Sequence, residues 1–108
     1  MMLLIRFVAA VALLWVAAQP TLAQSDLKRG ETLLTRDCAR CHAVGASGAS
    51  PRPDAPAFRT LGTRYPIDSL EEALGEGIVS GHPDMPEFRF DADEVGAIID
   101  FLKSIQRP

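Results

Sequence analysis

The stretch Cys38-Ala39-Arg40-Cys41-His42 decides how the rest of this sequence is interpreted. Its two cysteines and its histidine stand at positions i, i+3 and i+4, so on a helical turn their side chains share one face. These are the only two cysteines of the 108-residue chain, and the only other histidine is His82. Two thiols and one imidazole are therefore expected to act together on a single ligand.

This C-x-x-C-H spacing is the attachment signal for c-type haem. The thiols of Cys38 and Cys41 can add to the two vinyl groups along one porphyrin edge. The imidazole of His42 then reaches the iron as its proximal ligand. We therefore predict one covalently bound haem c, with its iron, as the cofactor.

Three other interpretations of the cysteine pair stay open. A thioredoxin-like redox pair also has the C-x-x-C spacing, but it expects a βαβ context that the sequence lacks. A zinc site would need a fourth ligand and usually a second paired set. A disulfide across two intervening residues would close a loop too short to stabilise the fold much.

The N-terminus predicts a secretory signal peptide. Residues 7–18 (FVAAVALLWVAA) follow the basic Arg6 as an apolar run of h-region length, and Thr21-Leu22-Ala23 supplies a cleavage site. We predict a cleaved signal peptide at residues 1–23 and one mature domain at residues 24–108. An uncleaved membrane anchor is the alternative, although the apolar run is shorter than the ~20 residues that a spanning helix needs.

The predicted mature chain is acidic. Without Arg6 it carries ten Lys and Arg against 14 Asp and Glu, a net charge of −4 with His neutral. Nucleic acids and anionic lipids attract basic surfaces, so we expect no nucleic-acid partner and no stable membrane insertion after cleavage. A domain this small buries a modest core and often needs a cofactor to complete it.

Helical periodicity without strand alternation predicts an all-α domain, with three main helices and long loops wrapped around the haem. Ser25-Asp26 is expected to cap a first helix that starts at Leu27 and runs to the cysteine motif. Gly30 within it predicts a close crossing by another helix. Residues 44–56 contain three prolines and are expected to form a loop.

Two further helices are expected. Asp68-Ser69 stands three residues before Glu71-Glu72, which is the pattern of two overlapping capping boxes, and this central helix should end near Ile78. The last helix should open with Asp91 as its cap and Glu94 three residues on. Its apolar face has the spacing i, i+3, i+4, i+7 and i+10 and consists of Val95, Ile98, Ile99, Leu102 and Ile105.

The predicted second loop supplies a sixth ligand for the iron. Met85 stands in Pro83-Asp84-Met85-Pro86, where the prolines limit the conformations of the backbone. We expect its thioether to ligate the iron; His82 is the alternative and would give a bis-histidine haem of lower potential. An apolar shell around the haem is expected from Leu34, Phe58, Leu61, Leu74, Ile78, Phe88 and Ile98.

Over residues 26–106 the sequence resembles class I cytochromes c, and within them the small bacterial monohaem type. The resemblance is carried by the motif Cys38–His42, by Gly30, by residues 81–86 (GHPDMP) and by the apolar last helix. It implies the cytochrome c fold, in which the first and last helices cross at Gly30 beside Phe101. It also implies that Met85 is the axial methionine.

The resemblance extends to residues around the haem. It implies that the carbonyl of Pro56, in a loop that also holds Pro51 and Pro53, accepts a hydrogen bond from His42 and so fixes the imidazole ring. Candidates for contact with the haem propionates are Arg59, Arg64 and Tyr65.

The expected function is that of a periplasmic one-electron carrier without enzymatic activity, either a monomer or a subunit of a redox complex. Its expected partners are periplasmic redox proteins or components of a respiratory chain. One alternative is a dedicated electron-accepting subunit of a periplasmic dehydrogenase or oxidase. Another is a haem sensor or peroxidase in which Met85 leaves the iron.

Overall fold

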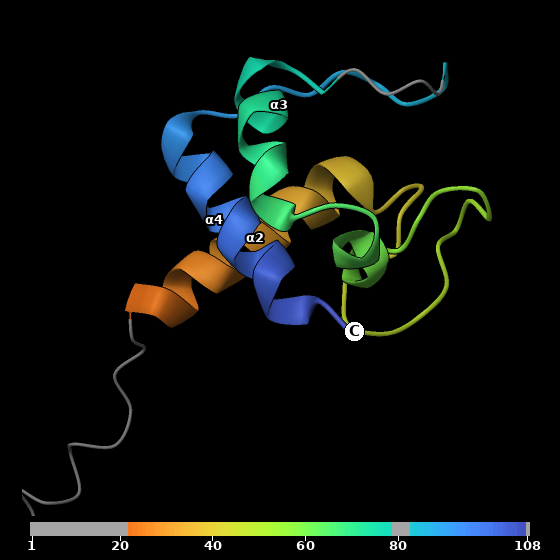
Figure 1. Cartoon of the computed structure of the whole chain (residues 1–108), viewed down its shortest axis with the longest axis horizontal. Coiled ribbons are helices and arrows are strands. Elements are labelled where there is room, and N and C mark those ends of the chain that lie inside the picture. The colour runs from red at the N-terminus through yellow and green to blue at the C-terminus, as the bar shows by residue number, and fades with distance from the viewer. Residues whose placement is uncertain (1–21, 79–82, 108) are drawn as a thin grey trace, which may run out of the picture.

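The computed structural model describes residues 22–78 and 83–107, and within them every regular element is a helix. Helix α2 and helix α4 cross in the middle of the molecule, and α3 lies to one side of the crossing (Figure 1). The predicted all-α architecture is thus confirmed. The elements in chain order are α2 (Leu22–Cys38), the 3₁₀ helices η2 (Phe58–Thr63) and η3 (Ile67–Leu70), α3 (Glu71–Glu76) and α4 (Ala92–Ile105).

Helix α2 is already formed at Leu22, the first described residue and five residues before the predicted start, so the prediction that Ser25-Asp26 caps it was wrong. Leu22, Ala23 and Gln24 all have good helix propensity, and no proline or glycine interrupts them. Leu22 is 85 % exposed, which means that local preference rather than burial extends the helix here. The predicted signal peptide before Leu22 lies outside the described residues.

The crossing of α2 and α4 depends on Gly30, as predicted. A Cβ placed on Gly30 would overlap the carbonyl oxygen of Ala97 and would stand 2.9 Å from Cβ of Phe101. Only glycine lets the two backbones approach this closely. Phe101 is itself buried, so the aromatic partner expected at the crossing is in place.

The central helix differs from its prediction at its N-terminus. Asp68 and Ser69 lie inside η3, the N-terminal cap of α3 is Leu70, and no side chain caps the helix. The carboxylate of Asp68 instead pairs with Nζ of Lys103 on α4, at 2.5 Å. The 3₁₀ turn moves the start of α3 beyond both predicted caps. The helix ends at Glu76, and its C-cap is Gly77, whose φ is 116°.

Helix α4 matches its prediction in full. The side chain of Asp91 accepts from the backbone N–H of Glu94, and the side chain of Glu94 accepts from the backbone N–H of Asp91. Its apolar face forms much of the core, with Ile98 fully buried. None of the helices in the described part is long and apolar enough to span a membrane.

Candidate haem-binding site

The cysteine motif continues the last turn of α2. The backbone N–H groups of Cys41 and His42 both donate to the carbonyl oxygen of Cys38, at 3.2 and 3.0 Å. This i, i+3, i+4 turn places the three side chains on one face, as their spacing predicts. All three line the same cavity.

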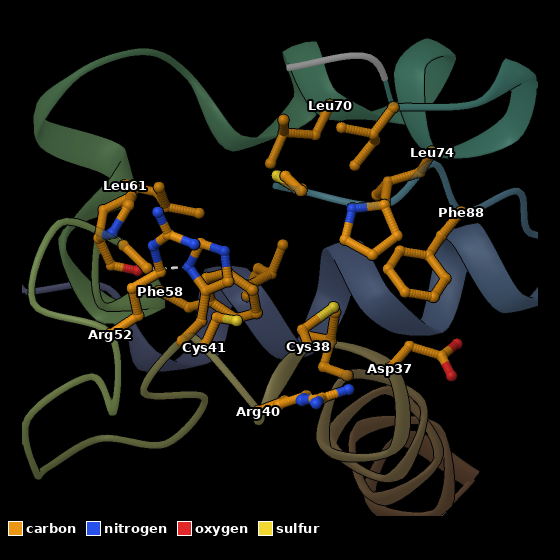
Figure 2. A pocket seen from close by; sticks show the side chains of 18 of the residues that line it. Asp37, Cys38, Arg40, Cys41, Arg52, Phe58, Leu61, Leu70, Leu74 and Phe88 are labelled. Atoms are coloured by element: carbon orange, nitrogen blue, oxygen red, sulfur yellow. Dashed lines mark hydrogen bonds between the residues drawn. The ribbon is translucent and has the colours of Figure 1, made fainter. Parts of the chain in front are cut away.

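The cavity has a volume of about 710 Å³, within the usual range of cofactor sites. Cys38 and Cys41 form one wall, and Leu70 and Leu74 lie on the opposite side (Figure 2). The other apolar walls come from residues far apart in the sequence: Leu34, Phe58, Leu61, Ile78, Phe88, Phe90 and Leu102. A flat, apolar macrocycle that is attached to the two cysteines fits this cavity.

The imidazole of His42 is held from two directions. Its Nδ1 lies 2.8 Å from the carbonyl oxygen of Pro56, and its ring stacks on Phe58 with centroids 4.7 Å apart and planes at 28°. A carbonyl oxygen can only accept, so Nδ1 carries the proton and donates. In the neutral ring Nε2 then keeps its lone pair for a metal.

The two thiols are free and half-buried. Burial raises the pKa of the Cys38 thiol to about 11, and the charge of Asp37 adds to the shift. A redox-active C-x-x-C pair needs a lowered thiol pKa, so this environment argues against the thioredoxin-like alternative. Among the described residues no three His, Cys, Asp or Glu side chains are grouped to hold a metal ion, so the zinc alternative gains no support.

Met85 also lines the cavity, which places a thioether in the same chamber as His42. Hydrogen bonds fix both ends of the segment that carries it. Ile78 N–H donates to the carbonyl of Phe88 at 3.2 Å, and Phe90 N–H donates to the carbonyl of Leu74 at 2.9 Å. His82, the alternative ligand, lies outside the described residues.

The predictions for the propionate contacts and for the apolar shell around the haem are only partly met. Of the three propionate candidates, Tyr65 lines the cavity, whereas Arg59 and Arg64 do not. Ile98 was wrongly placed in the shell around the haem. It is buried in the core but does not line the cavity, and Leu102, one turn further along α4, does.

Sequence reasoning missed the charged residues at the cavity. Arg52, Asp54 and Asp84 line it together, although 32 residues separate Arg52 from Asp84. In the sequence these residues are not distinguishable from ordinary polar loop residues, because no periodic pattern indicates that the two loops contact each other. Only the folded chain brings them together.

Comparison with known families supports the same assignment. The family model for cytochrome c matches residues 27–106, which is most of the chain and includes every cavity residue named above. Searches of curated proteins and of solved structures gave no significant match. The chain therefore belongs to the cytochrome c family, whose members bind haem c covalently and transfer electrons through it.

Proposed function

We propose that this protein is an exported one-electron carrier with a His/Met-ligated haem c. Cys38 and Cys41 would hold the haem by thioether bonds, and His42 and Met85 would bind the iron. The observation that carries the proposal is that one apolar cavity is lined by both thiols, by an imidazole whose Nδ1 is already engaged, and by a thioether. The haem, when bound, supplies an iron that alternates between its ferric and ferrous states.

The chain's own residues would keep this iron in electron transfer rather than in catalysis. The carbonyl of Pro56 orients the imidazole of His42 and raises its basicity as a ligand. Met85 would occupy the position that a substrate needs, and a thioether ligand favours the reduced iron. The apolar walls lower the local dielectric and exclude water, which also raises the reduction potential.

An optical spectrum tests the ligand set. The protein would be produced with its leader in cells that attach haem c, and then oxidised and reduced. We expect a sharp reduced α-band that survives denaturation, and a weak iron–thioether band at the red edge of the oxidised spectrum. Met85→Ala should lose the thioether band and keep the covalent haem. His82→Ala should keep both.

The opposite result would overturn the proposal. If Met85→Ala keeps the thioether band, or if His82→Ala changes the axial ligation, then Met85 is not the sixth ligand. If the wild-type chain carries no haem under these conditions, the two cysteines must have another role. Cys38→Ala and Cys41→Ala, which should each leave a single thioether bond, serve as intermediate controls.

The location and partners form part of the proposal. The predicted leader at residues 1–23 directs the mature domain to the periplasm, where redox proteins would dock briefly to it. Cell fractionation followed by N-terminal sequencing tests this. We expect the haem protein in the periplasmic fraction with Gln24 as its first residue. Haem protein found only in the membrane fraction, with an intact N-terminus, would show that the leader is retained as an anchor.

A further inference from the structure

We propose that Arg52 is a positioning residue that holds the segment carrying Met85 against the haem-attachment motif. The inference rests on the proposed function, since it takes Met85 as the sixth ligand. Arg52 lies in the loop that follows His42 and belongs to neither helix of the crossing. Its position lets one residue join the two segments that supply the axial ligands.

The backbone of Arg52 is attached to the cysteine motif. Its N–H donates to the carbonyl oxygen of Cys41 at 3.1 Å, and its own carbonyl accepts from the N–H of Ala55 at 3.1 Å. These bonds fix Arg52 relative to the residue before His42. They do not depend on the side chain and would persist in a substituted protein.

The side chain of Arg52 reaches the other ligand segment. Its Nη2 donates to Oδ2 of Asp84 at 3.0 Å, and its Nε donates to Oδ1 of Asp54 at 2.7 Å. Asp84 immediately precedes Met85. The Arg52 side chain is 35 % exposed and that of Asp84 is 63 % exposed. Charge-assisted hydrogen bonds are stronger than those between neutral groups, although solvent screens this one in part.

Removal of the guanidinium has a second effect. Asp54 and Asp84 both accept hydrogen bonds from the Arg52 guanidinium, so its removal takes away an attraction that offsets the repulsion between the two carboxylates. The repulsion would push Asp84 away from the loop and take the backbone of Met85 with it. The ends of the Met85 segment stay anchored at Ile78 and Phe90, so the disturbance should be confined to the ligand.

Competition by imidazole for the oxidised iron tests the proposal in the haem-loaded protein. Imidazole binds only when Met85 leaves, so its apparent affinity reports how firmly Met85 is held. We expect Arg52→Gln to raise this affinity about 2- to 5-fold at low salt, the upper part of the range for an ion pair that is open to solvent. The difference should shrink in 1 M salt, where charges are screened within about 3 Å.

Lys28→Gln is the matched control. Lys28 also pairs with a carboxylate, that of Glu31 on α2 at 3.4 Å, but it does not line the cavity. The variant changes the net charge by the same amount and removes no contact to the Met85 segment. Its imidazole affinity should equal that of the wild type. If Lys28→Gln and Arg52→Gln raise the affinity equally, general charge explains the effect and the proposal fails.

Asp84→Asn separates the ion pair from other roles of Arg52. It should act in the same direction but by less, because its amide oxygen still accepts a hydrogen bond. The double variant Arg52→Gln/Asp84→Asn should bind imidazole no more tightly than Arg52→Gln alone, since both remove one interaction. Fully additive effects would overturn the proposal, and Asp84→Asn decides the matter if Arg52→Gln fails to load haem.

Met85→Ala distinguishes the two possible failures. If it leaves the imidazole affinity unchanged, Met85 does not ligate the iron and the proposed function fails with the inference. If it raises the affinity strongly while Arg52→Gln matches the wild type, Met85 is the ligand and only the positioning role of Arg52 is refuted.

Discussion

Gly30 shows how much one missing side-chain atom decides in this molecule. It lies where α2 passes over α4, and the carbonyl carbon of Ala97 would stand 2.7 Å from a Cβ at this position. A backbone carbonyl within a helix cannot rotate away as a flexible side chain could. A larger residue must therefore push the two helices apart, and that would also disturb the cavity that they help to build.

We expect Gly30→Ala to destabilise the haem-loaded protein by about 3 kcal/mol, the upper part of the range for overpacking. For a domain of this size the melting temperature should fall by more than about 10 °C. Thermal unfolding followed by circular dichroism measures this. Gly96→Ala is the control, since Gly96 also lies in a helix but nothing stands within 4 Å of an added Cβ. It should be neutral or stabilising by up to about 1 kcal/mol.

A fall of less than about 1 kcal/mol in the free energy of unfolding of Gly30→Ala would mean that the two helices can move apart at little energetic cost, which would contradict the geometry described above.

Also at the residue scale, the cysteine motif could be interpreted from the sequence because its chemistry is local. Cys38, Cys41 and His42 need only one helical turn to come together. Pro56 is different: its contact with His42 spans 14 residues and rested on family resemblance until the structure placed the two atoms 2.8 Å apart.

At the scale of elements, α3 and α4 show when a capping pattern in the sequence is sufficient to predict where a helix starts. Both helices have an acidic or hydroxyl residue three positions before a glutamate, but only α4 forms the capping box. Before α3, the residues 67–70 form a 3₁₀ turn whose Ile67 is buried, and Asp68 is drawn to Lys103 on α4. Tertiary contacts thus override the local signal at α3, whereas the local signal determines the start of α4.

Asp91→Ala tests the contribution of the capping box of α4. We expect the free energy of unfolding to fall by about 1 kcal/mol, because the backbone N–H of Glu94 loses its acceptor. Denaturant unfolding of the haem-loaded protein measures the change. Asp93→Ala, which removes an acidic residue from the same first turn without touching the cap, should cost less than about 0.5 kcal/mol. Equal losses in both variants would indicate a helix-dipole effect and no specific cap.

At the scale of the whole molecule, the C-terminal end of the described chain closes the fold on η2, near the middle of the sequence. The side chain of Gln106 accepts from the N–H of Gly62 at 2.7 Å and donates to the carbonyls of Phe58 and Leu102, each at 2.8 Å. These bonds join η2 to the end of α4. One of them holds the backbone of Phe58, the residue whose ring stacks on His42.

We expect Gln106→Ala to lower the free energy of unfolding by about 1–3 kcal/mol, since it leaves partly buried backbone groups without their partners. Chemical unfolding of the haem-loaded protein is the measurement. The neighbouring Arg107→Ala is the control, because the Arg107 side chain is exposed and its backbone N–H bond to Arg59 does not depend on it. A loss in Gln106→Ala no larger than in Arg107→Ala would show that these contacts contribute nothing measurable.

The haem-free chain should lose its fixed tertiary packing. Without the cofactor the walls of a cavity of about 710 Å³ lose their packing partner. We expect the near-UV circular dichroism of the apoprotein to be flat and its unfolding to lack a cooperative transition, in contrast to the haem-loaded form. A cooperative transition with native near-UV signals in the apoprotein would contradict this.

The sequence by itself determined whatever depends on neighbours within a few turns of the chain. The haem-attachment motif, the cap and apolar face of α4 and the proline-rich loop all belong to this class. The tertiary structure decided what depends on contacts between distant segments. It set the start of α3, placed Leu102 rather than Ile98 at the cavity, and paired Arg52 with Asp84. The physical reason is that a loop sequence has no periodicity that indicates which distant segment the loop contacts. Such contacts form only when the core has assembled, so the sequence of one segment does not predict them.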